Sequence, residues 1–199
     1  PYESKIRLKM SFRGLSELSI VDEDSEEIYQ FLQLFESITS LCINNSDSYS
    51  SYPNYQSYRI GPQHIQHLQY LKRLSFSGGE INSITVKFLG NLKSLNELDI
   101  KKCTFLEGSE QGLRELTGLT ELNMGENKYI SFKERDDEYL CYLINLKVLK
   151  IHSITSIKYV GFLRNLESLK LQDVSDISFV DFPSLYYLSS LELVYAEYI

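Results

Sequence analysis

The sequence of 199 residues contains no tryptophan, only three cysteines and four prolines, and fewer basic than acidic residues. Cys42, Cys103 and Cys141 are far apart and form no Cys-x-x-Cys pair. We therefore expect neither a disulfide framework nor a zinc site, and a reducing compartment is favoured. No apolar run reaches the ~18 residues that a membrane span needs. The net charge of −7 is the wrong sign for binding phosphates, so we expect no nucleic-acid partner.

Motifs that would support catalysis are missing as well. The sequence contains no glycine-rich phosphate loop and no Gly-x-Ser-x-Gly turn. No histidine is placed beside a cysteine, although a cysteine nucleophile needs such a base. His64 and His67 are spaced to share one side of a helix, but no Cys, Asp or Glu nearby completes a metal site, so we expect both to face solvent. We predict a protein that is not an enzyme and holds no metal or cofactor.

The dominant feature of the sequence is a repeated pattern, Leu-x-x-Leu-x-Leu, in which Ile, Met or Phe can replace a leucine. It is found eight times, with intervals of 23, 33, 24, 24, 27, 20 and 22 residues, and it begins at Leu15, Ile38, Leu71, Leu95, Leu119, Leu146, Leu166 and Leu188. An apolar residue also stands three positions before each start: Phe12, Phe35, Leu68, Leu92, Leu116, Leu143, Leu163 and Leu185. Two registers that agree indicate a solenoid built over residues 1–199 as a single domain.

The spacing within the repeat predicts its local structure. The fourth and sixth residues of each pattern are two apart, so both point to one side of a short strand. One strand cannot bury its apolar side alone, whereas stacked repeats form a parallel sheet over a continuous core. We predict about eight strands on the concave side of the solenoid. Helical spacing in residues 25–36 and 62–70, and β-branched residues in 154–162, predict a convex side of mixed helical, 3₁₀ and extended segments.

These residues resemble the leucine-rich-repeat family. The stretch LNELDIKKCTFLEGSEQGLRELTGLTELNMGEN, residues 95–127, is similar to repeats of bacterial leucine-rich-repeat proteins and of ribonuclease-inhibitor-like proteins, and the repeats after Leu146 are similar to internalin repeats. The resemblance implies an α/β leucine-rich-repeat solenoid. It also implies that the side chain of the ninth residue of a repeat forms hydrogen bonds to backbone groups at a turn. Stacked from repeat to repeat, these residues form a structural ladder, to which Cys103 and Asn127 would belong. Gly79, Ile154, Val174 and Ala196 depart from this ladder.

Charged residues are segregated along the predicted strands. The side chains that point away from the core include an acidic group followed by a basic one, and the binding residues we predict from them are Arg73, Glu97, Asp99, Glu121, Asn123, Lys150, His152 and Lys170. Charges arranged in this way steer and select protein partners. The alternative is a solvated surface on which the charges are distributed at random. With strands ~4.8 Å apart, the concave side offers an area of ~500 Å², less than the ~800 Å² of a stable interface.

One interval, residues 44–61, is rich in tyrosine and can supply the missing area. Tyr49, Tyr52, Tyr55 and Tyr58 are spaced by three among serines and asparagines, a composition typical of adaptable binding loops. The alternative is that these tyrosines pack against the solenoid or lie in a polar loop without a function.

The sequence thus favours a protein-interaction module. The family resemblance implies that the chain could be a secreted bacterial effector, active in a host cytoplasm. Two alternatives are a ligand-recognition fragment of an immune-type receptor and a spacer for a domain outside this chain. Neither end of the sequence shows a polar capping repeat, so we also expect an exposed apolar edge at one end, covered by self-association or by sequence missing from this chain.

Overall fold

The computed structural model describes residues 5–7, 15–21, 32, 35–44, 65–78, 80–81, 83–105, 112–127, 136–152, 157–174 and 180–194. Tyr49, Tyr52, Tyr55 and Tyr58 lie outside these residues, and so does most of the helix expected over residues 25–36.

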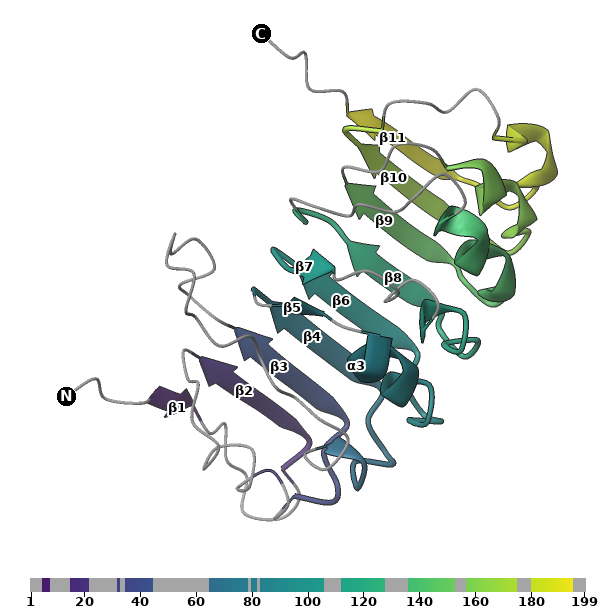
Figure 1. Cartoon of the computed structure of the whole chain (residues 1–199). Helices are drawn as coiled ribbons and strands as arrows, with labels where there is room; N and C mark the ends of the chain where they lie inside the picture. The colour runs from purple at the N-terminus through teal and green to yellow at the C-terminus, as the bar shows by residue number, and fades with distance from the viewer. Residues whose placement is uncertain are drawn as a thin grey trace, which may run out of the picture.

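The strands form one open sheet of nine, in which all neighbours from β2 onward are parallel (Figure 1). In order across the sheet they are β1 (Lys5–Arg7), β2 (Glu17–Val21), β3 (Ser40–Asn44), β4 (Arg73–Ser77), β6 (Glu97–Lys101), β8 (Glu121–Met124), β9 (Val148–His152), β10 (Ser168–Gln172) and β11 (Ser190–Val194). The eight parallel strands confirm the predicted sheet, and the chain folds as a leucine-rich-repeat solenoid.

The ninth strand, β1, was not expected. It pairs antiparallel with β2, with Ile6 opposite Ile20. Only residues 8–16 connect it to β2, fewer than the dozen or so that a parallel crossover needs. A strand that is joined to its neighbour by a short connection can pair only in the antiparallel sense.

The core lies behind the sheet. In the parallel strands before β11 the fourth and sixth residues of each repeat are buried, as are Leu98 and Ile100 of β6, while the residues between them keep some exposure. The strands pair in phase, so that equivalent leucines stack: Leu74 pairs with Leu98, and Leu98 with Leu122. Each repeat therefore covers the apolar side of the next.

The same turn precedes six strands of the main sheet: β4, β6, β8, β9, β10 and β11. The first leucine of a repeat donates its backbone N–H to the carbonyl three residues earlier, as Leu95 does to Leu92 (2.9 Å). The next two N–H groups share one carbonyl of the preceding repeat, as Thr120 and Glu121 share the oxygen of Asn96 (2.8 and 3.0 Å). These bonds join the start of each strand to the preceding repeat in the same register.

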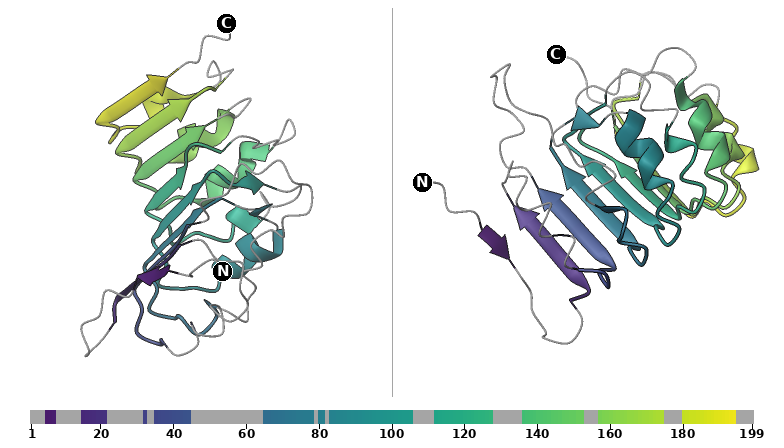
Figure 2. Two further views of the ribbon diagram at one scale, coloured as in Figure 1. Left: turned by 90° about the vertical axis from the view of Figure 1, so that its left-hand side faces the viewer. Right: turned by 60° about the horizontal axis from the view of Figure 1, so that its bottom comes forward.

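The return segments lie on the other side of the sheet, as the views in Figures 1 and 2 show. They are mixed as predicted: an α-helix, α3 (Ser83–Leu89), is followed along the chain by the 3₁₀ segments η1 (Asp136–Tyr142), η2 (Lys158–Phe162) and η3 (Phe182–Ser184). A second small sheet joins β5 (Glu80–Ile81) to β7 (Thr104–Phe105). Across the described ranges, no helix is both long and apolar enough to span a membrane.

Candidate functional site

The solvent side of the sheet, which we call the strand face, presents two rows of polar side chains. The first row follows the third residue of each repeat and contains Ser40, Arg73, Glu97 and Glu121 on neighbouring strands. The second row follows the fifth residue and runs through Cys42, Ser75, Asp99, Asn123 and Lys150. In-phase pairing therefore brings residues from five repeats onto one surface.

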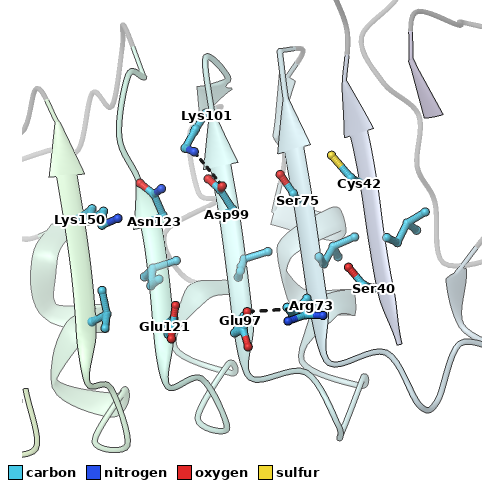
Figure 3. Close-up of a pocket in the computed structure, with 15 residues that line it drawn as sticks. Ser40, Cys42, Arg73, Ser75, Glu97, Asp99, Lys101, Glu121, Asn123 and Lys150 are labelled. Carbon is cyan, nitrogen blue, oxygen red and sulfur yellow. Dashed lines mark ion pairs between the residues drawn. The ribbon is translucent and has the colours of Figure 1, made fainter. Parts of the chain in front are cut away.

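These two rows enclose a shallow hollow of about 350 Å³ across β3, β4, β6, β8 and β9 (Figure 3). Besides the members of both rows, its polar lining includes Lys101, the seventh residue of its repeat. Six of the predicted binding residues line it together: Arg73, Glu97, Asp99, Glu121, Asn123 and Lys150. The hollow is open and polar, and it is surrounded by charges of both signs.

Arg73 connects the first row. Its guanidinium lies 3.2 Å from a carboxylate oxygen of Glu17 on β2 and 3.9 Å from one of Glu97 on β6. To reach β2 it must pass over β3, where the facing residue is the small Ser40. Arg73 is therefore held between two acids, with half of its side chain still exposed.

Asp99 and Lys101 form an ion pair within β6, at 2.9 Å between Oδ2 and Nζ. They are two residues apart, so both project from the same side of the strand. The other carboxylate oxygen of Asp99, Oδ1, is buried and has no hydrogen-bond partner among the described residues. It is therefore an unsatisfied acceptor in a residue that lines the hollow.

Glu121 and Lys150 are the charges of the hollow that form no ion pair within the described part of the chain. Both side chains are exposed, and they project from adjacent strands, β8 and β9 (Figure 3). Asn123 lies between them in the second row, where its Oδ1 accepts a hydrogen bond from the N–H of Gly125 (3.0 Å). An acidic group and a basic group are thus both available to a partner.

The remaining predicted residues, His152 and Lys170, lie outside the hollow. His152 Nε2 is 2.6 Å from Asp173 Oδ2, and both side chains are mostly buried. Lys170 forms an ion pair with Glu192 at 2.7 Å, and beside it Lys147 pairs with Glu167 at 2.8 Å. Because its ammonium donates to Glu167, the pKa of Lys147 is raised. The basic group predicted from the sequence is therefore largely paired with acids of the following repeats.

Cys103 and Asn127 lie below the end of the strand face. Asn127 is fully buried; its amide oxygen accepts from the N–H of Cys103 (2.8 Å), and its amide nitrogen donates to the carbonyls of Ile100 and Met124 (2.8 Å each). The Cys103 thiol donates to the carbonyls of Gly78 and Lys101 (3.3 and 3.2 Å). Burial raises the pKa of this thiol to about 12, so it stays protonated and unsuited to act as a nucleophile.

In the four repeats whose eighth residue the structure describes, that residue has a left-handed backbone. Gly78, Lys102, Glu126 and Asp173 each occupy the eighth position of a repeat, with φ of 82°, 52°, 58° and 53°. This conformation turns the chain from the strand into the return segment. Glycine adopts it without strain, whereas the other three residues do so at a cost of ~1–2 kcal/mol each.

Several features of the site were not among those predicted from the sequence. Ser40, Cys42, Ser75 and Lys101 line the hollow but were not among the predicted binding residues; the signal was their place in the same strand registers. His67, expected to face solvent, is half-buried, and its Nε2 lies 2.9 Å from the carbonyl of Leu32 in the preceding repeat. Among the described residues, no three Cys, His, Asp or Glu side chains are grouped as a metal site would require.

Comparison with known proteins supports the fold. The chain is similar to an internalin of Listeria monocytogenes, with a TM-score of 0.59 and 18% identity over 90% of this chain and 48% of that one. It is also similar to a leucine-rich-repeat protein of Leptospira interrogans, with a TM-score of 0.61 and 24% identity over 90% of this chain and 43% of that one. It spans less than half of each of these structures. No protein-family model and none of the curated proteins matches it.

Proposed function

We propose that this chain is a protein-interaction module that binds its partner on the strand face, over the hollow between β3 and β9. The observation that carries the proposal is the convergence of side chains from five repeats on one open surface, where Glu121 and Lys150 are unpaired among the described residues and Asp99 Oδ1 is a free acceptor. Buried polar atoms usually have a hydrogen-bond partner, so Asp99 favours a ligand that donates.

Electrostatics supports a partner that carries both signs of charge. A basic side chain suits Glu121 and the free oxygen of Asp99, while an acidic one suits Lys150. Such complementary pairs set specificity and the rate of association more than the final affinity. The Arg73 pairs hold the acidic part of the surface in place, so little of it must be ordered on binding.

The tyrosine-rich insert, residues 44–61, is part of the proposal. It follows β3 directly along the chain, and β3 supplies Ser40 and Cys42 to the hollow. Removal of an interface tyrosine can cost ~2 kcal/mol or more. We expect the joint replacement of Tyr52 and Tyr55 by alanine to weaken binding at least about tenfold, or ~1.4 kcal/mol. An unchanged dissociation constant would exclude the insert from the site.

A charge exchange tests the strand face directly. The double variant Glu121→Lys with Lys150→Glu conserves net charge and breaks no ion pair between described residues, so the fold should be unaffected. The matched control is Arg114→Glu with Glu115→Lys, an exchange within a pair 3.6 Å apart in a return segment. Immobilised wild-type chain and both variants would be used to capture proteins from host-cell lysate, and bound proteins would be quantified by mass spectrometry.

We expect one protein to bind the wild-type chain stoichiometrically. The control variant should capture it equally well, and the strand-face variant should not capture it. A partner retained equally by both variants would place the binding surface elsewhere. The setting we propose is that of a secreted bacterial effector, with an immune-type receptor fragment as the alternative. The absence of any stoichiometric partner would favour the third alternative, a spacer for another domain.

A further inference from the structure

Large apolar side chains are exposed along the edge of the sheet where β9, β10 and β11 begin. Tyr142, Ile144, Phe162 and Tyr186 are 45%, 57%, 58% and 78% exposed. Tyr142 and Phe162 are the last residues of η1 and η2, while Ile144 and Tyr186 lie in the turns that lead into β9 and β11. We call these four side chains the edge patch.

The members of the edge patch occupy equivalent positions in successive repeats. In each of these repeats the first leucine donates its N–H to the carbonyl three residues earlier, so the turns before β9, β10 and β11 are alike. The three strands also pair in phase. Ile144, Arg164 and Tyr186 therefore follow one another in a row along the solenoid, and Tyr142 and Phe162 form a second row beside it.

Neither the repeat nor the position in the stack requires this apolar surface. Ile144 and Phe162 belong to repeats that have a described neighbour on both sides, so their exposure does not depend on where the stack ends. The same positions in the repeats of β6 and β8 are exposed and polar: Asn91, Lys93, Glu115 and Thr117. Large apolar side chains gathered on one part of a surface mark an interaction site.

A cation lies within the edge patch. Arg164 is exposed between Ile144 and Tyr186 in the first row, and it forms no ion pair with another described residue. The ring of Phe162 in the second row stacks on that of Tyr159, at 5.9 Å between centroids. Aromatic side chains and arginine are enriched at the centres of protein interfaces. The chemistry of the patch thus suits a partner with apolar side chains around one acid.

We propose that the edge patch is a second binding surface, separate from the strand face, that docks an acidic amphipathic helix of a partner protein. Repeats are ~4.8 Å apart in the sheet, and helix side chains three or four residues apart have Cβ atoms ~5–6 Å apart. A helix that lies along the solenoid can therefore place an apolar residue, an acid and a second apolar residue, at i, i+3 or i+4, and i+7, against Ile144, Arg164 and Tyr186. Its other apolar side chains cover Tyr142 and Phe162.

Two other occupants fit the edge patch less well. A second copy docked on a two-fold axis at the centre of the first row would place Arg164 opposite the Arg164 of that copy, and juxtaposed like charges oppose association. An anionic lipid surface would face the whole molecule, which has a net charge of −7, whereas the acid of a helix faces Arg164 alone.

Selection from a library of displayed helical peptides tests the proposal. The positions i, i+3, i+4 and i+7 would be randomised on a constant helix-forming framework, and the bait would be the immobilised wild-type chain. We expect enrichment of apolar residues at i and i+7 and of Asp or Glu at i+3 or i+4. Selection on Arg164→Glu should exchange this acidic preference for Lys or Arg. Enriched peptides without the pattern, or with the same pattern on both baits, would overturn the proposal.

The dissociation constant of the most enriched peptide, measured by fluorescence anisotropy, tests where it binds. Ile144→Ser and Phe162→Ser should each raise this constant at least about tenfold, with circular dichroism showing that the fold is kept. Tyr70→Ser, at a 65% exposed tyrosine in the turn before β4, is the matched control and should leave it unchanged.

Two further measurements separate the alternatives. The strand-face exchange of Glu121→Lys with Lys150→Glu should not affect the selected peptide; a loss of binding there would place the peptide on the strand face and overturn the edge patch as its site. Sedimentation with anionic phosphatidylserine vesicles should leave the chain in solution. Vesicle binding that Ile144→Ser abolishes would assign the patch to a lipid surface instead of a helix.

Discussion

At the scale of single residues, Asn127 is the most constrained polar side chain of the described chain. It is fully buried, and all three of its hydrogen bonds go to backbone groups of two successive turns. Buried backbone groups need partners, and the strand-to-return turn provides none of its own. Asn127 therefore completes the hydrogen bonding of its own turn and of the turn that contains Cys103.

We predict that Asn127→Ala lowers the free energy of unfolding by ~3 kcal/mol. The substitution leaves the N–H of Cys103 and two carbonyls buried without partners, and one such loss costs ~1–3 kcal/mol. Chemical denaturation followed by circular dichroism would measure the change. Asn145→Ala, which removes one exposed bond to the carbonyl of Thr117, is the control and should cost less than ~1 kcal/mol. An equal loss of stability in the two variants would contradict the role assigned to Asn127.

The Cys103 thiol allows a prediction about pH. Burial raises its pKa to about 12, so the buried thiol is neutral, while in the unfolded chain it ionises at ordinary values. Its contribution to stability is thus complete below the unfolded pKa and is lost as pH rises through the folded one. At pH 9 we expect iodoacetamide to modify the partly exposed Cys42 and to spare Cys103 in the native chain. Modification of both at similar rates would contradict this assignment.

At the scale of elements, the return segments pack against each other with little space. Gly112 shows this most clearly: a Cβ atom there would lie 2.7 Å from the backbone nitrogen of Lys87 and 2.9 Å from Cβ of Val86, both in α3. The segment after β7 thus approaches the helix of the preceding repeat as closely as a glycine allows. By contrast, a Cβ atom at Gly118 would meet its nearest neighbour, the carbonyl oxygen of Leu95, at 3.4 Å.

We predict that Gly112→Ala lowers the free energy of unfolding by ~1–3 kcal/mol, because the added methyl group forces α3 and its neighbour apart. Gly118→Ala should be neutral or stabilise by up to ~1 kcal/mol, because alanine restricts the unfolded chain. Thermal unfolding of both variants would decide. A Gly112→Ala chain as stable as wild type would show that the return segments adjust more freely than their contacts suggest.

At the scale of the whole molecule, charge acts on the surface and contributes little to the fold. Apart from His152–Asp173, the ion pairs between described residues join side chains that are about a third or more exposed. Such pairs contribute ~0–1 kcal/mol each, often less. The stability of the solenoid comes from the leucine stack, and the strand-face charges are available for partner recognition.

We predict that raising NaCl from about 0.1 M to about 1 M, which shortens the screening length from ~10 to ~3 Å, changes the free energy of unfolding by less than ~1 kcal/mol. The same change should weaken capture of a strand-face partner strongly, because association there depends on unpaired charges. Urea titrations at both salt concentrations would measure the first effect. A large loss of stability in high salt would mean that the ion pairs hold the fold together.

The sequence by itself determined the strands and the sides they present. Leu98 and Ile100 are buried while Asp99 faces solvent because side chains alternate in a strand, and a repeat of about 24 residues stacks equivalent positions whatever lies between them. For the same reason Arg73, Glu97 and Asp99 could be assigned to one surface. The identity of most of the lining of the hollow follows from local pattern and repeat spacing alone.

Only the tertiary structure decided which of these side chains meet. Arg73 reaches Glu17 because Ser40, one repeat away, is small, and Lys147 and Lys170 are paired with acids that lie about 20 residues further along the chain. The antiparallel strand β1 and the exposed leucines of β11 are likewise features of the two edges of the described sheet. A repeat pattern predicts only the positions that are alike in every repeat. Contacts between side chains on neighbouring strands depend on residues that differ from one repeat to the next.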